Sequence, residues 1–191
     1  MLDPRTPDPA PRPAEQADAG AGGAGAPPSP ETANRAPPDL TREYEGAGIR
    51  VQWYAGRCIH SAACIRALPA VFDARRRPWI ALDGADADAV AAAVLRCPTG
   101  ALHFVRTDGG ANERPDPALT VRAVRDGPLY VRGDIELVDE AGRVVRHDTR
   151  LALCRCGKSR RPPMCDNSHR EKRFRSGEGD AARLARGPSM P

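Results

Sequence analysis

Residues 154–169 read CRCGKSRRPPMCDNSH and place four metal-type ligands within sixteen residues. The ligand candidates are Cys154, Cys156, Cys165 and His169, with the spacing C-x-C-x8-C-x3-H. Thiolates at positions i and i+2 can converge when the backbone turns at Gly157. Three thiolates with one imidazole suit either zinc or an iron–sulfur cluster. The spacing therefore predicts a metal site and leaves a Cys3His zinc site and an iron–sulfur site equally open.

The six cysteines of this 191-residue chain divide into two groups of three, and the other group is Cys58, Cys64 and Cys97. Three disulfides would suit a secreted protein, but the N-terminal sequence shows no apolar signal segment. We therefore expect a cytoplasmic protein, in which clustered cysteines more often bind metal. Aromatic residues make up only 4% of the chain, so each folded unit should depend on such a metal for stability. The pattern predicts two metal sites, each one cysteine short of four.

The first cysteine group has a spacing related to that of bacterial ferredoxins. Residues 58–64 read CIHSAAC, and Cys97 is followed by proline. Bacterial ferredoxins hold a cubane cluster with C-x2-C-x2-C and a remote Cys-Pro, and Ser61 stands here at the place of the middle cysteine. Three thiolates suit a [3Fe-4S] cluster, or a [4Fe-4S] cluster whose fourth iron has another ligand, for which His60 is a candidate. The alternative is three buried cysteines that pack as small apolar side chains.

The apolar pattern predicts an α+β fold. Residues 49–53 and 101–106 alternate as strands, and residues 62–68 and 86–96 have helical periodicity. After a linker rich in Gly, Asn and Pro, the pattern predicts strands alone, over 119–124 and 128–138 and from Val144 to Cys154, with no helix. His103 and His147 fall within strand patterns and are expected to be structural.

The same pattern predicts the domain organisation. The segments are a disordered Pro/Ala/Gly-rich arm (1–42), a first domain (43–107), a linker (108–116), a β-rich second domain (117–174) and a flexible tail (175–191).

The second cysteine group resembles the CDGSH iron–sulfur domain of the mitoNEET type, whose pattern is C-x-C-x2-[ST]-x3-P-x-C-D-G-[SAT]-H. The matching residues are Cys154, Cys156, Ser159, Pro163, Cys165, Asp166, Ser168 and His169. Asn167 replaces the usual glycine, and asparagine tolerates the left-handed backbone that a glycine would adopt. The resemblance covers about residues 117–174 and implies a [2Fe-2S] cluster on the three cysteines and His169. A neutral imidazole carries one negative charge fewer than a thiolate, which favours reduction, and acid can compete with iron for it.

The first cysteine group resembles the divergent mono-cluster 4Fe-4S ferredoxin domain over about residues 44–106. The matching segments are Cys58-Ile59-His60, Cys64, Leu68-Pro69, Val71-Phe72-Asp73, Arg77-Pro78-Trp79-Ile80 and Cys97-Pro98-Thr99-Gly100-Ala101-Leu102. The resemblance implies a small ferredoxin-like α+β unit that holds a cubane-type cluster on Cys58, Cys64 and Cys97.

These features predict an electron carrier with two clusters, and no catalytic constellation points to an enzyme. The alternative is a cluster-transfer or redox-sensing protein that uses the labile histidine-ligated site. A zinc-bearing nucleic-acid module is a third class, since eleven basic residues lie between Arg143 and Arg175. Aromatic residues for base stacking are almost absent there, so redox partner proteins with acidic surfaces explain the charge better. No apolar run is long enough to span a membrane, and the oligomeric state does not follow from the sequence.

Overall fold

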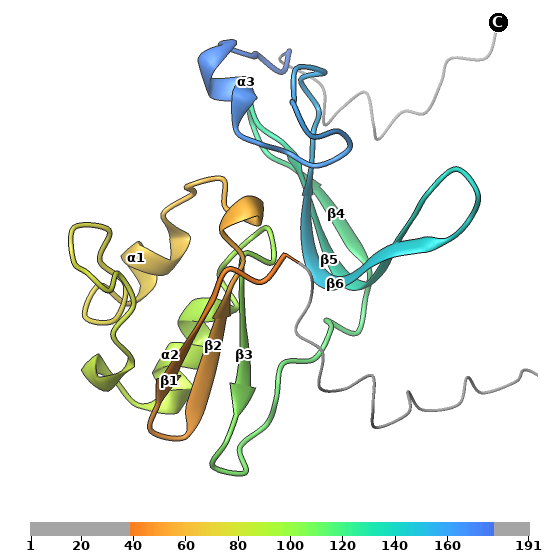
Figure 1. The fold of residues 1–191 in the computed structure, drawn as a ribbon. Coiled ribbons are helices and arrows are strands. Elements are labelled where there is room, and N and C mark those ends of the chain that lie inside the picture. The colour runs from red at the N-terminus through yellow and green to blue at the C-terminus, as the bar shows by residue number, and fades with distance from the viewer. Residues whose placement is uncertain (1–38, 178–191) are drawn as a thin grey trace, which may run out of the picture. The chain divides into compact units, whose positions relative to one another are not determined.

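The structure is a computed structural model, and it describes residues 39–177, which fall within a single structural unit. The first sheet has the order β1-β2-β3 and consists of β1 (Arg42–Gly46), β2 (Ile49–Trp53) and β3 (Leu102–Arg106), all antiparallel (Figure 1). Tyr44, Val51 and Phe104 are neighbours across these strands, and all three side chains are buried. This alternation gives the sheet one apolar face.

The helix α2 (Ala87–Val94) packs on β2 and β3, and the single turn η2 (Leu82–Gly84) packs on β1. The helix α1 (Ala63–Ala67) packs on α2, and the single turn η1 (Ala55–Arg57) follows β2 along the chain. The Asp86 carboxylate caps α2 by accepting a hydrogen bond of 2.8 Å from the Ala89 backbone N–H. Val90 and Val94 lie one turn apart on α2 and are fully buried in the core. Cys97 donates its backbone N–H to the Val94 carbonyl at 2.9 Å, so the turn that ends α2 carries Cys97 into the same core.

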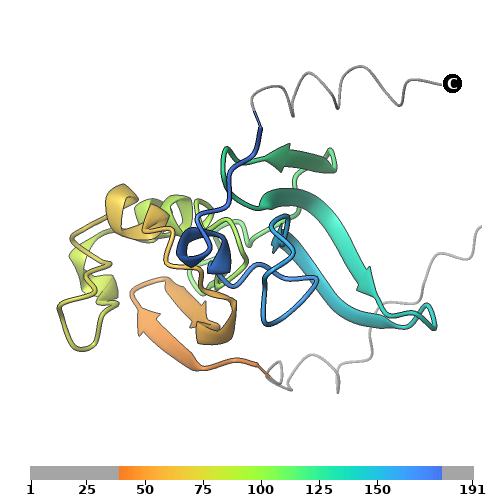
Figure 2. The same cartoon turned by 90° about the horizontal axis from the view of Figure 1, so that it is seen from above.

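The second sheet has the order β4-β5-β6 and consists of β4 (Thr120–Ala123), β5 (Leu129–Val138) and β6 (Val144–Leu153). Figure 2 shows the long hairpin of β5 and β6, whose strands run side by side. The pairing shifts between Arg132 and Ile135, where Gly133 has a φ of 133°. A Cβ at Gly133 would lie 2.8 Å from the Cα of Leu119, so glycine is required at this bulge. The helix α3 (Ser168–Glu171) follows β6 along the chain.

A buried arginine of β6 joins the second domain to the first. The Arg150 side chain is 1% exposed. Its guanidinium donates to the carbonyl of Val94 at 2.7 Å, to the carbonyl of Leu102 at 2.9 Å, and to the Glu113 carboxylate at 2.8 Å. One side chain of β6 thereby binds the end of α2, the start of β3 and the linker.

A buried carboxylate two residues before Arg150 makes a second set of contacts between the domains. Asp148 accepts from the guanidinium groups of Arg57 at 3.1 Å and Arg146 at 2.5 Å, and His103 Nε2 lies 3.4 Å from it. His103 Nδ1 in turn lies 3.1 Å from the Glu113 carboxylate. Charges of both signs are paired here, as buried charges require.

The predicted α+β class is confirmed, since each half of the described chain holds a three-stranded antiparallel sheet with short helices. Four elements are additional: the single turns η1 and η2, the strand β1, which begins inside the predicted arm, and the helix α3, where the prediction of no helix is wrong. α3 is a single turn, too short to show a period in the sequence.

The predicted disordered arm lies outside the described residues up to position 38, and so does the predicted flexible tail from position 178. In residues 39–177 no helix has the length and apolar character needed to cross a membrane.

Candidate metal centres

The second cysteine group lies where β6 ends. The Cys154 backbone N–H donates to the Pro163 carbonyl, and the Cys165 N–H donates to the Ala152 carbonyl, both at 2.8 Å. These two bonds return residues 163–165 alongside the end of β6, so Cys165 lies beside the chain that leads into Cys154. The Sγ atoms of Cys154 and Cys156 are 3.7 Å apart, and the chain turns directly after them at Gly157, which has a φ of 67°. The convergence predicted for these two thiols is therefore observed.

The turn between Cys165 and His169 brings the other two candidates together. The Cys165 Sγ lies 3.5 Å from His169 Nδ1. Asn167 has a φ of 77°, a left-handed conformation that the usual glycine would adopt without strain. Its backbone N–H points at the Cys165 Sγ at 3.4 Å. The Asp166 carboxylate accepts from the Ser168 N–H at 2.9 Å and so supports the turn into α3.

The electrostatics of this site suit a thiolate-bound metal group. Burial alone would raise the pKa of the Cys154 thiol, but the N–H groups of Ser159, Gly157 and Lys158, together with the Cys156 thiol, hold it below its usual value. Burial lowers the pKa of His169, so its ring is neutral near neutral pH and able to donate a lone pair to a metal. Amide N–H groups aimed at thiolates and a neutral imidazole are a donor set that fits an iron–sulfur cluster.

The first cysteine group gathers around one apolar core. Cys58 follows η1, Cys64 lies in α1 and Cys97 follows α2, and all three pack in the core of the first domain. Burial, together with the negative charge of the nearby Cys97 thiolate, raises the pKa of Cys64 to about 11. The His60 backbone N–H points at the Cys58 Sγ at 3.4 Å. Buried thiols with an amide donor also fit an iron–sulfur cluster, which stabilises their thiolate forms.

A cavity of about 590 Å³ opens beside two of these cysteines. Its walls include Cys58, Cys64, His60, Trp53 and Trp79. The two tryptophan rings pack edge to face with centroids 5.3 Å apart. His60 is exposed and adopts a φ of 53°, which turns the chain between the two cysteines. Its place on the wall keeps it a candidate for a fourth ligand.

The remaining histidines occupy other places. His103 lies in β3 within the buried charge network, and His147 Nε2 lies 2.7 Å from the exposed Asp134 carboxylate. In the part of the chain that the structure describes, no three His, Cys, Asp or Glu side chains surround a point suited to a single metal ion. Ligation by the seven predicted residues stays a prediction.

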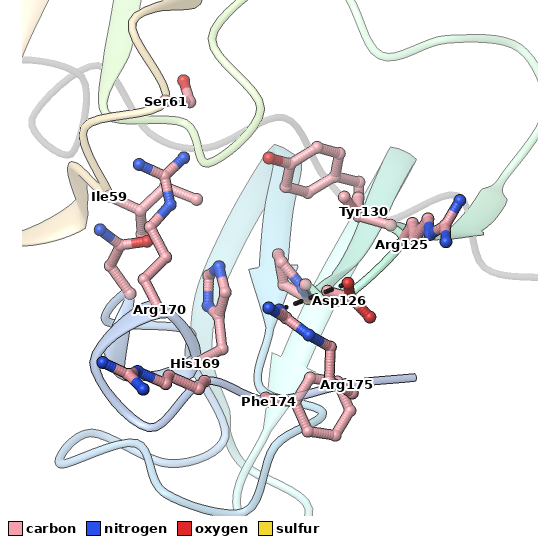
Figure 3. A pocket seen from close by; sticks show the side chains of 14 residues that line it. Ile59, Ser61, Arg125, Asp126, Tyr130, His169, Arg170, Phe174 and Arg175 are labelled. Atoms are coloured by element: carbon pink, nitrogen blue, oxygen red, sulfur yellow. Dashed lines mark ion pairs between the residues drawn. The ribbon is translucent and has the colours of Figure 1, made fainter. Parts of the chain in front are cut away.

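The side chain of Ile59 links the two candidate sites. Ile59 is the neighbour of Cys58 in the chain, is 4% exposed, and packs in one apolar cluster with Cys165 and Ala152. Ile59 and Ser61 of the first domain line the same cavity as His169 and Tyr130 of the second, as Figure 3 shows. The sequence gives no signal of this contact, because an isolated isoleucine between two polar loops has no periodicity.

Comparison with known proteins places both cysteine groups in known families. Two family profiles match, "Divergent 4Fe-4S mono-cluster" over residues 44–107 and "Iron-binding zinc finger CDGSH type" over residues 126–170. The uncharacterized protein YjdI of Escherichia coli K12 is 36% identical over 63 residues, which are 33% of this chain and 83% of YjdI. YjdI of Escherichia coli O157:H7 matches to the same extent.

The chain belongs to the divergent 4Fe-4S mono-cluster family through its first domain and carries a CDGSH-type iron-binding domain after it. It is an iron–sulfur protein, and both predicted resemblances are confirmed in the predicted order.

Proposed function

We propose that the protein is an electron carrier with two iron–sulfur clusters. The second domain would hold a [2Fe-2S] cluster on Cys154, Cys156, Cys165 and His169. The first domain would hold a cubane-type cluster, [4Fe-4S] or [3Fe-4S], on Cys58, Cys64 and Cys97. Bound clusters of these kinds take up and release single electrons.

The observation that carries this proposal is the apolar cluster that Ile59 forms with Ala152 and Cys165. Cys58 precedes Ile59 in the chain, so a ligand candidate of one site is one residue away from a cluster that contains a ligand candidate of the other. Arg150 and Asp148 hold the two domains in this arrangement through buried ion pairs and hydrogen bonds. Two redox groups held side by side serve electron transfer, whereas a protein that only stores or delivers a cluster has no need of the second one.

The residues around the sites have definable roles in this proposal. The backbone N–H groups at Asn167 and His60 donate toward Cys165 and Cys58 and would stabilise the thiolate charge. Ile59 excludes water from the contact between the sites, since its side chain is buried. The neutral His169 ring would keep the second site less negative than an all-cysteine site, which favours reduction.

The surroundings suggest the kind of partner and compartment. Exposed basic side chains follow the second site, among them Arg170, Lys172 and Arg173, and would attract redox partner proteins with acidic surfaces. All six cysteines are free thiols, a state that the cytoplasm maintains. We assign no catalytic residues and no nucleic-acid or membrane partner.

A second candidate function is cluster transfer or redox sensing. It is favoured by one observation, that His169 lines an open cavity, where solutes can reach the ligand most easily exchanged.

Reductive titration under argon separates these two functions. A carrier should accept about one electron for each cluster, return the electrons to an oxidant and keep its iron. Loss of iron to an apo-ferredoxin, with no reversible reduction, would refute the carrier proposal and favour transfer. Arg143→Gln is a suitable control variant for this titration, because Arg143 forms an ion pair with Asp139 at the surface. Changes of Trp53 or Trp79 to phenylalanine are unsuitable as controls, because both side chains line the cavity of the first site.

A further inference from the structure

A cavity of about 520 Å³ lies beside the second site, on the side where His169 is reached from outside. One wall is the loop over residues 124–128, and another is α3 with the segment that follows it (Figure 3). Ile59 and Ser61 of the first domain complete it. A volume of this size suits a small molecule.

The walls of this cavity are fixed by specific bonds. The Ser176 N–H donates to the Asp126 carboxylate at 2.8 Å, and the Asp126 N–H donates to the Ser176 hydroxyl at 2.9 Å. The Phe174 N–H donates to the His169 carbonyl at 2.9 Å. The Arg155 guanidinium donates to the Val124 carbonyl at 2.6 Å. The residues that line the cavity are therefore positioned without any ligand.

The lining is strongly basic. Four arginines line it, namely Arg125, Arg170, Arg173 and Arg175, against a single carboxylate, that of Asp126. An Asp126 carboxylate oxygen lies 3.5 Å from a guanidinium nitrogen of Arg175. Within residues 39–177 no carboxylate lies in ion-pairing range of the other three arginines. Arg173 also has a φ of 49°, an uncommon conformation for a residue with a long side chain. Guanidinium groups bind phosphate and carboxylate in bidentate fashion.

The lining also has an apolar part. Ile59, Tyr130 and Phe174 lie among the arginines, and Phe174 is held below the Arg155 guanidinium at 5.4 Å. Burial raises the pKa of Tyr130, so its hydroxyl stays protonated and able to donate a hydrogen bond. Apolar and aromatic walls with a few placed polar groups are typical of small-molecule sites.

We infer that this cavity binds a small organic anion, one that joins a phosphate or carboxylate group to an apolar ring. The anionic group pairs with Arg170 and Arg173, and the ring packs on Tyr130 and Phe174; Figure 3 shows Arg170 beside Ile59 on the cavity wall. Binding itself does not depend on which metal group the second site holds.

A consequence for the second site rests on the proposed function. His169 lines the same cavity, so a bound anion places negative charge beside the site and makes its reduction harder. By reciprocity, the reduced protein binds the anion more weakly. Each tenfold loss of affinity on reduction lowers the potential by about 59 mV.

Isothermal titration calorimetry of the iron-loaded protein under argon tests the inference. The probes are phenyl phosphate and phthalate, which separate the phosphate from the carboxylate source, and pyrophosphate, which lacks a ring. We expect saturable binding of one ringed anion per chain, weaker binding of pyrophosphate, and a loss of about tenfold in affinity in Arg173→Gln or Arg170→Gln. Lys172→Gln is the matched control, because Lys172 is adjacent, exposed and outside the cavity lining.

Two results would overturn the inference: no saturable binding of either ringed anion, or equal weakening in Lys172→Gln and Arg173→Gln, which would show diffuse attraction to a basic surface. Failure of binding with a normal iron content refutes only the anion site. Binding in a protein that holds no iron–sulfur cluster refutes only the proposed function.

Discussion

Replacing Arg150 by methionine should weaken the contact between the two domains and lower the free energy of unfolding. The arginine is 1% exposed and donates three hydrogen bonds, to the Val94 carbonyl at 2.7 Å, the Leu102 carbonyl at 2.9 Å and the Glu113 carboxylate at 2.8 Å. Methionine keeps most of the apolar stem, so the change mainly removes the charged head. Two carbonyls lose a donor, and Glu113 loses its buried cation.

The expected loss of stability follows from those contacts. Removing one partner of a buried ion pair costs about 3–5 kcal/mol, because the other charge stays buried without compensation. Glu113 retains His103 Nδ1 at 3.1 Å and the Thr149 hydroxyl at 2.5 Å, so the lower part of that range is expected, about 3 kcal/mol. With a urea dependence of about 2 kcal/mol per molar, the unfolding midpoint should fall by about 1.5 M.

Urea unfolding under argon, followed by circular dichroism, measures this change. Arg143→Met is the matched control, since Arg143 is 79% exposed and pairs with Asp139 on the surface, and it should cost less than about 1 kcal/mol. A loss below about 1 kcal/mol for Arg150→Met, equal to that of the control, would refute the idea that Arg150 holds the domains together.

Three further predictions concern the sites and the charge network. Cys97→Ala should remove the first cluster, so that the iron content falls by about three or four atoms per chain, and should leave the spectrum of the second cluster unchanged. An unchanged iron content would show that Cys97 is not a ligand. His169→Cys should add one negative charge to the second site and lower its reduction potential, measured by voltammetry, whereas an equal potential would exclude His169 as a ligand. The pKa of Glu113 is held low, against the effect of burial, by His103 and Arg150, so its contribution to stability is full above about pH 4.5 and is lost as pH falls through its lowered pKa. Glu113→Gln should therefore show a shallower loss of urea stability between about pH 5 and pH 3, and an identical pH profile would contradict this.

The elements that the sequence predicts well are those with clear local patterns. The strand at residues 49–53 is observed with those bounds, and α2 begins where Asp86 caps it. β1 is missed because its five residues contain a single apolar side chain, Tyr44, which is buried between charged neighbours that remain exposed. α3 is missed because one turn cannot show a helical period.

Contacts between the domains are the part that no local pattern could reveal. Asp148 and Arg150 alternate on β6 as solvent-facing residues of a strand would, yet both are buried against the first domain. Opposite charges two positions apart are the only trace of this in the sequence. The pairing with Val94, 56 residues away, depends on the folded arrangement of both sheets.

Iron and acid-labile sulfide counts with electron paramagnetic resonance, on protein purified under argon, test the central claim most directly. The account predicts about six iron atoms and six sulfides per chain, or five irons if the first cluster is [3Fe-4S], and two separable cluster signals, of which Cys97→Ala removes one. A colourless protein that holds zinc, or a single cluster signal that survives both Cys97→Ala and Cys165→Ala, would contradict it.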